Sequence, residues 1–168
     1  QAVTTENFGL NLNFTSSHNT NEVTDLGEGV TSLGTFGPKL GYPVDAVFRR
    51  KVVSAALNAQ GHAINIQCDD DKGGSTPNCA TAPAVYLGVF DPRWEGAISA
   101  TATLWKRLRI YGLMDYKLGN KHIDNNRRAL CQVFRRCDEN FNPLNYDPLL
   151  IAEIQMNNVA QNWVANDA

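Results

Sequence analysis

The chain has 168 residues, of which 43% are hydrophobic and 19% are charged, and its formal net charge is −2. This length predicts a single domain with a core of its own, and the composition excludes a disordered tail. The nearly balanced charge provides no global attraction to nucleic acid, which is therefore not expected as a partner. No run approaches the roughly 18 apolar residues of a membrane-spanning helix, so no helical span is expected.

Alternation of apolar and polar residues predicts that most of the chain forms β-strands. FGLNLNFT, residues 8–15, has the period of two that is typical of a half-buried strand. Residues 46–57 fit either a strand or a helix, and the β-branched Val52 and Val53 favour a strand. Glycines and prolines predict an irregular connection over 27–43. The other strands predicted in the first half of the chain are 23–27, 62–67 and 85–90.

The stretch from Trp94 to Lys121 predicts a long hairpin. Residues 97–104 alternate between small or aliphatic side chains and hydroxyl-bearing ones, and the basic pair after Trp105 breaks this pattern. A second strand is predicted over 108–116, with bulky apolar groups on both of its faces. Strands of this kind occur in β-sandwiches and in barrels whose outer wall meets lipid.

The last third of the chain is predicted to be helical. Asp124 is a candidate N-cap for a helix within 123–137. Asp147 is a candidate N-cap for a second helix, with Pro148 at its first position. The apolar stripe of this second helix is Leu150, Ile151, Ile154 and Val159.

These elements together predict a mainly β fold. It is either an antiparallel sheet or a small β-sandwich derived from barrel-like hairpins, with two helical segments in the C-terminal third. We expect one domain, in which residues 1–121 form the antiparallel β region and residues 122–168 form a helical appendage packed on or beside it.

Four cysteines occur as two close pairs, Cys68 with Cys79 and Cys131 with Cys137. An even number at short separations favours disulfides formed in an oxidising compartment, with free thiols as the alternative. Zinc binding is poorly supported, because neither pair has the C-x-x-C spacing of a zinc site. Six residues along a continuous helix separate two side chains by about 240°, so the second bond requires the first helix to end near Phe134.

No group of residues is spaced for catalysis. His18, His62 and His122 lie in or beside predicted turns and have no carboxylate or second histidine at ligand spacing. Nucleophile, phosphate-binding and dinucleotide motifs do not occur. The acidic run 69–71 lacks the spacing of a calcium loop, and a solvated run of charge is its ordinary explanation. We therefore predict a protein that is not an enzyme and has no metal or cofactor.

Positive charge gathers between Lys106 and Arg136, where nine basic residues stand against two acidic ones. With nearby aromatic side chains, such a stretch is typical of an interface with an acidic protein surface or with lipid headgroups. Dispersed, solvated charges are the alternative. The predicted partner-binding residues are Arg107, Arg109, Lys117, Lys121, Arg127, Arg128, Arg135, Arg136, Trp94, Trp105, Tyr111, Tyr116 and Phe134.

Several motifs resemble, in the same order, the late barrel region of TonB-dependent outer-membrane receptors of the SusC-like branch. They are LGEGV at 26–30, GYPVDAVFRRKV at 41–52, VYLGVFDPRWEGAISATATLWKRLRIYGLMDYKLGNK at 85–121 and NNRRALCQVFRRC at 125–137. The plug and TonB box of that family do not occur in these residues. The family's acidic D-x-N-G-D-G turn appears here as LNAQGHAINI, residues 57–66, without its acids. The resemblance therefore implies common ancestry and carries over no site residue.

Two functions are compatible with the sequence. The first is a non-enzymatic accessory or structural subunit, periplasmic or otherwise extracytoplasmic, that binds and stabilises a membrane protein complex. Its partners are other protein subunits of that complex, with lipid headgroups as a further contact. The alternative is a part of a TonB-dependent receptor that acts in solute uptake across an outer membrane. Strands separated from a larger sheet leave unpaired edges and lipid-facing apolar groups, and such strands rarely stay ordered alone. The sequence therefore favours the subunit over a part of a receptor.

Overall fold

The computed structural model describes residues 2–156 and 164–166 of the chain. The fold is mainly β, with 42% strand, 16% helix, antiparallel sheets and helices in the C-terminal third, as predicted. Contacts divide the chain into two compact units, each described by itself below. Unit 1 comprises residues 2–20 and 91–120, and unit 2 comprises Asn21–Phe90 and Lys121–Asn166. Among the described residues, no helix combines the length and the apolar character needed to cross a bilayer. The predicted division of a single domain at residue 121 stays a prediction.

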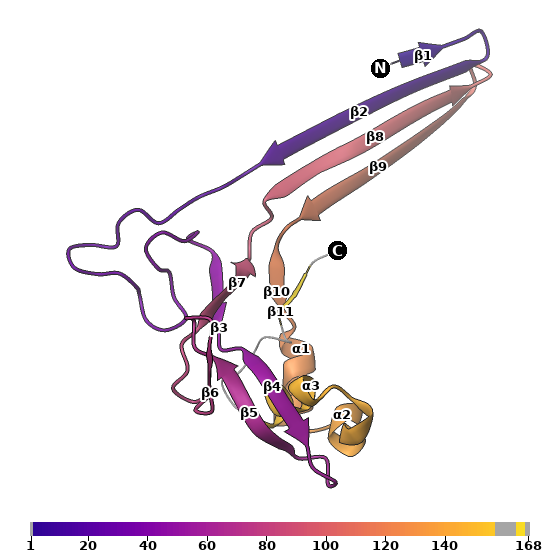
Figure 1. Cartoon of the computed structure of the whole chain (residues 1–168). Helices are drawn as coiled ribbons and strands as arrows, with labels where there is room; N and C mark the ends of the chain where they lie inside the picture. Colours follow the sequence, from indigo (N-terminus) through magenta and orange to yellow (C-terminus); the bar gives the residue numbers. More distant parts are fainter. Residues whose placement is uncertain (1, 157–163, 167–168) are drawn as a thin grey trace. The chain divides into compact units, whose positions relative to one another are not determined.

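Unit 1 is one antiparallel sheet with the strand order β1-β2-β8-β9 (Figure 1). Its bounds are Ala2–Thr4 for β1, Phe8–His18 for β2, Trp94–Leu104 for β8 and Leu108–Leu118 for β9. The three long strands pair without interruption over their whole length. The predicted hairpin is therefore confirmed, and the strand predicted over 8–15 continues to residue 18.

The two tight turns of unit 1 lie at the same end of the sheet. Residues 5–7 join β1 to β2, and residues 105–107 join β8 to β9. The backbone N–H of Trp105 donates to the carbonyl of Asn7 at 2.7 Å, which ties the two turns together. Trp105 and Lys106 both have positive φ, as the two central residues of the tightest hairpin turns do. The long connections to unit 2 all leave from the other end of the sheet.

The described residues of unit 2 form three small antiparallel sheets. Strand β3, Ala46–Arg49, pairs with β7, Val85–Val89, and β10, Lys121–Ile123, pairs with β11, Val164–Asn166. The third sheet has the order β4-β5-β6, with bounds Val52–Leu57, Ala63–Asp69 and Ser75–Thr76. Residues 46–57 are therefore extended, as predicted, but they form two strands of different sheets.

The helical part of unit 2 begins at the predicted caps. The carboxylate of Asp124 accepts from the backbone N–H of Arg127, and that of Asp147 accepts from the N–H of Leu149, both at 2.8 Å. Pro148 occupies the first turn of the second capped helix, as expected. The helical elements are α1 (Asn125–Arg128), the π-helix η1 (Ala129–Val133), α2 (Asp138–Phe141), the 3-10 helix η2 (Pro143–Asn145) and α3 (Pro148–Gln155).

Both predicted disulfides are present. Cys68 bonds to Cys79 and Cys131 bonds to Cys137, with Cα–Cα distances of 5.2 and 5.0 Å. The helix that carries Cys131 ends at Val133 with Phe134 as its C-cap, and the positive φ of Arg135 turns the chain back. The expected helix end is therefore confirmed.

One predicted strand is wrong, and one predicted helix ends early. Residues 23–27 form no strand, because the carboxylate of Asp25 accepts from the N–H of Gly27 at 2.8 Å and starts a turn. A side chain that binds its own backbone competes in this way with a sheet ladder. Helix α3 ends at Gln155, so Val159, predicted to belong to its apolar stripe, lies outside the described residues.

Unit 2 has several small cores in place of one large one. Val52, Ala82 and Ala152 pack around the Cys68–Cys79 bond. A second cluster surrounds the Cys131–Cys137 bond with Ile154, and Phe48 forms a third with two alanines. Such small clusters bury little apolar area, so the covalent bonds supply part of the stability.

Replacing both Cys68 and Cys79 with Ser should lower the free energy of unfolding of unit 2 by about 3 kcal/mol, the entropy-model value for a loop of this length. Urea denaturation followed by circular dichroism measures this change. Adding reductant should lower the free energy of unfolding of the unmodified chain. In the variant the Cys68–Cys79 bond is already absent, so reductant cannot act through it. Equal midpoints for the variant and the unmodified chain would show that the bond does not stabilise unit 2.

Candidate functional site

The register of unit 1 separates its side chains by chemistry. Residues directly opposite each other on antiparallel strands share a face, and the pairs Phe8–Leu104 and Leu104–Leu108 place all even-numbered residues of the three long strands together. This even-numbered face, called the apolar face below, contains no Asp, Glu, Lys or Arg. The odd-numbered face, called the polar face, carries Glu95, Arg109, Asp115 and Lys117.

The apolar face is exposed. Phe14 is 66% exposed, Met114 60% and Ile110 53%, although a protein core would bury such side chains. No second layer of unit 1 covers this face in the part of the chain that the structure describes. Soluble monomers rarely leave so continuous an apolar surface in water. The other exposed large residues of the face are Phe8, Leu12, Trp94, Ile98, Leu108 and Leu118.

Aromatic side chains gather at the end of the apolar face that is opposite the tight turns. The ring of Tyr116 stacks on Phe14 at 6.2 Å, and its hydroxyl donates to the carbonyl of Thr15 at 3.4 Å. Gly96 lies beside this ring, and a Cβ there would overlap the Tyr116 phenol and the Thr15 carbonyl oxygen. The close approach of these two groups therefore requires glycine at position 96. Tyrosine suits such an end, because its ring is apolar and its hydroxyl is polar.

The polar face has two shallow, open hollows. One has a volume of about 530 Å³ and is lined by residues that include Asn11, Thr101, Arg109 and Tyr111. The other, of about 440 Å³, is lined by the hydroxyls of Thr15 and Ser17 and by Glu95, Asp115 and Lys117. Tyr111 and Leu113 are the bulky exceptions on this face, as the sequence predicted for the second strand of the hairpin. The hollows can hold water or a polar solute.

The outer edge of β9 is open to a further strand. Among the described residues, β9 pairs with β8 alone, so one edge of an eleven-residue strand keeps its N–H and C=O groups unpaired within the sheet. Such an edge is where another strand adds to a sheet. Unit 1 therefore has both a bare face and an open edge.

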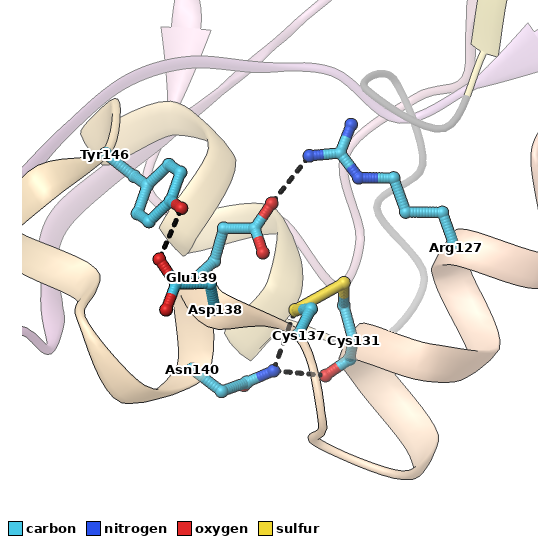
Figure 2. Close-up of polar contacts among 7 residues, drawn as sticks. All are labelled: Arg127, Cys131, Cys137, Asp138, Glu139, Asn140 and Tyr146. Atoms are coloured by element: carbon cyan, nitrogen blue, oxygen red, sulfur yellow. Dashed lines mark hydrogen bonds and ion pairs between the residues drawn. A yellow bond between two sulfur atoms is a disulfide. The ribbon is translucent and has the colours of Figure 1, made fainter.

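A compact polar cluster in unit 2 surrounds the second disulfide (Figure 2). The side-chain amide of Asn140 donates to the carbonyl of Cys131 and contacts the sulfur of Cys137, both at 3.0 Å. Arg127 forms an ion pair with Glu139 at 2.6 Å, and the Glu139 side chain is only 8% exposed. These contacts hold α2 against the helix that carries Cys131.

Asp138 ends the same cluster on its exposed side. Its two carboxylate oxygens accept hydrogen bonds from Tyr146 at 2.6 Å and from Asn142 at 2.7 Å. The bond from Tyr146, followed by that from Asn142, holds the pKa of Asp138 below its ordinary value. The same bond to Asp138 raises the pKa of Tyr146.

The cluster has no free thiolate to offer a metal ion. The sulfurs of Cys131 and Cys137 and a carboxylate oxygen of Glu139 lie within 4.8 Å of one another. The two sulfurs are bonded together, and Glu139 is already paired with Arg127. We therefore assign this cluster a structural role.

The predicted partner-binding residues are distributed over both units. Arg127, a predicted partner-binding residue, forms an ion pair with Glu139, a residue that the sequence pattern did not indicate. The members in unit 1 are Trp94, Trp105, Arg107, Arg109, Tyr111, Tyr116 and Lys117. The members in unit 2 are Lys121, Arg127, Arg128, Phe134, Arg135 and Arg136. Their role in partner binding stays a prediction.

No protein-family model and no curated protein matches the chain.

Replacing Tyr146 with Phe should raise the pKa of Asp138 toward its ordinary value, because the main hydrogen-bond donor to its carboxylate is lost. Asn142→Ala should raise the pKa of Asp138 by a smaller amount. A lowered pKa means that this contact stabilises the fold above about pH 4 and that the stability is lost as pH falls through the lowered value. Carboxyl NMR titration measures the midpoint, with Tyr42→Phe as the control. An unchanged midpoint in Tyr146→Phe would refute the assigned cause.

Replacing Arg127 with Met should lower the free energy of unfolding by about 1–3 kcal/mol, because the buried Glu139 carboxylate loses its charged partner. Arg136 is exposed, so Arg136→Met is the matched control and should change stability by no more than about 0.5 kcal/mol. Urea denaturation compares the two. Equal effects would contradict a structural role for Arg127.

Proposed function

We propose that unit 1 is a stretch of the membrane-spanning sheet of an outer-membrane receptor, similar to the TonB-dependent kind, that acts in solute uptake. Unit 2 is then an extracytoplasmic segment carried by that sheet. The exposed apolar face, continuous over three strands in register and free of Asp, Glu, Lys and Arg, is the observation that supports this proposal most.

The length of the strands fits a bilayer. Eleven residues at about 3.3 Å each give a strand of roughly 36 Å. Strands of outer-membrane proteins are tilted by about 45°, so a strand of this length rises roughly 25 Å, which matches the apolar band of such proteins. The polar face then lines an aqueous interior, where its hollows and its charged side chains remain hydrated.

The connections of the sheet have the asymmetry of outer-membrane proteins. Their turns on the periplasmic side are short, and their extracellular loops are long. Unit 1 has both tight turns at one end, whereas the long connection from β2 to β8 and the segment after β9 leave from the other end. The two disulfides lie in the long segments, and disulfides persist in oxidising surroundings outside the cytoplasm.

The accessory subunit predicted from the sequence is the second candidate. It is supported by the open edge of β9, which offers a place for a strand of another protein. Protein interfaces, however, are enriched in Arg and have a charged or polar rim. The apolar face has no Arg, Lys, Asp or Glu over its three strands, which favours lipid over protein as its neighbour. The lack of enzymatic activity stays a prediction.

Two adjacent substitutions on β9 distinguish lipid from water. Met114 lies on the apolar face and Leu113 on the polar face, and their exposures of 60% and 56% are nearly equal. Met114→Arg should weaken partition of the chain into phosphatidylcholine vesicles by about 2 kcal/mol or more, roughly thirtyfold, because a charge then faces lipid. Leu113→Arg should change partition little. Flotation of vesicles in a density gradient measures both.

Equal flotation of Met114→Arg and Leu113→Arg would contradict the proposal. Failure of the unmodified chain to float with protein-free vesicles, combined with tight binding to a membrane protein, would favour the accessory subunit. Circular dichroism of each variant shows whether the sheet itself has been lost.

A further inference from the structure

A glycine opens the larger hollow on the polar face of unit 1. Gly9 lies directly opposite Thr103, which in turn lies opposite Arg109, so the three residues cross the sheet in one row. A Cβ built on Gly9 would make only an ordinary contact with the Cβ of Thr103, at 3.8 Å. A larger residue would therefore fit at this position, and the glycine keeps the middle of the row low.

The neighbouring row supplies polar groups and an aromatic ring. Asn11, Thr101 and Tyr111 lie directly opposite one another on the same face. Tyr111 is two residues from Arg109 along β9, so their Cα atoms are about 6.6 Å apart and their side chains leave the same face. The side chains of both rows line one hollow of about 530 Å³. The ring of Tyr111, which is 62% exposed, and the guanidinium of Arg109 therefore border a common space.

The guanidinium of Arg109 is the one charged group among the described residues that line this hollow. The second hollow differs, because Glu95 and Asp115 line it together with Lys117. Within the described part of the chain, Arg109 forms no ion pair, so its five N–H donors remain for other acceptors. The first hollow therefore favours a negatively charged group, and the second does not.

We propose that the hollow over Gly9 binds a small organic carboxylate with a flat, apolar body. The fork of the Arg109 guanidinium matches the two oxygens of a carboxylate. The exposed ring of Tyr111 provides a surface on which a flat ligand can stack. A single positive charge suits a singly charged carboxylate better than a doubly charged phosphate.

A carboxylate site would give the polar face a selectivity among solutes. As the solute class for uptake across a membrane, the organic carboxylate rests on the function proposed above. Binding itself needs only the polar face, because every residue that lines the hollow belongs to unit 1. Binding and the membrane role can therefore be measured separately.

An NMR titration of the full chain with sodium benzoate tests the site, at an ionic strength held constant with sodium chloride. The backbone amide signals of Thr103, Arg109 and Tyr111 should shift and reach saturation. Acetate has the carboxylate without the ring, and benzyl alcohol has the ring without the carboxylate. Each of these two should bind at least tenfold more weakly than benzoate.

Two substitutions within the hollow and one outside it complete the titration. Arg109→Gln removes the charged fork and should weaken benzoate binding at least tenfold. Gly9→Val fills the middle of the row and should weaken it to a similar extent; the φ of Gly9 is not positive, so the strand accepts valine there. Lys117→Gln removes a positive charge from the same strand and face, beside the second hollow, and is the matched control with unchanged affinity.

The proposal is overturned if benzoate causes no saturable shifts in the unmodified chain. It is also overturned if Arg109→Gln and Lys117→Gln weaken binding equally, since this would indicate screening of charge alone. Binding of acetate or inorganic phosphate as tight as that of benzoate would contradict the contact with Tyr111. If circular dichroism shows that Gly9→Val has lost the sheet, Arg109→Gln decides the outcome.

Flotation with vesicles separates the carboxylate site from the membrane role. Absence of benzoate binding, together with flotation that only Met114→Arg weakens, overturns the carboxylate site and leaves the membrane role intact. Benzoate binding that depends on Arg109, together with equal flotation of Met114→Arg and Leu113→Arg, supports the site and contradicts the membrane role.

Discussion

The uninterrupted register of β2, β8 and β9 is the constraint on which the membrane role proposed for unit 1 depends. Apolar and polar residues alternate along each strand. The register places the even-numbered side chains of all three strands on one face of the sheet. A slip of one residue between β8 and β9 would move Arg109, Asp115 and Lys117 onto the apolar face. The sheet therefore has one stable arrangement wherever that face meets an apolar medium. Its bare face, its polar hollows and its one-sided turns all follow from this pairing.

Alternation made much of unit 1 predictable from the sequence. In FGLNLNFT and in the stretch from Trp94 to Lys121, apolar residues recur at every second position. Two basic residues interrupt this alternation and mark the position of the turn. The helix starts at Asp124 and Asp147 could also be predicted from the sequence, because a carboxylate before a helical segment caps free backbone N–H groups. The two disulfides followed from the short separations of their cysteines.

Contacts between distant segments were not predictable in this way. Nothing local shows that β2 pairs with β8, since the first part of unit 2, Asn21–Phe90, lies between them in the chain. The role of Arg127 depends on Glu139, which becomes buried only when α2 folds back beside the disulfide. Phe36 likewise meets Arg49 and Arg50 across an irregular connection. The strand predicted over 23–27 is wrong, because the side chain of Asp25 bonds to the nearby backbone and starts a turn.

Spin-label accessibility along β9 would show whether the even-numbered face of the sheet meets lipid. Single nitroxide labels are placed at each position from Leu108 to Leu118 in the chain bound to phosphatidylcholine vesicles. Accessibility to oxygen, which concentrates in lipid, should peak at even-numbered positions, and accessibility to a water-soluble nickel complex should peak at odd-numbered ones. A sheet with one face in lipid and the other in water requires this opposed alternation with a period of two. Equal accessibility to the nickel complex on both faces, or loss of the alternation, would contradict a lipid-facing sheet.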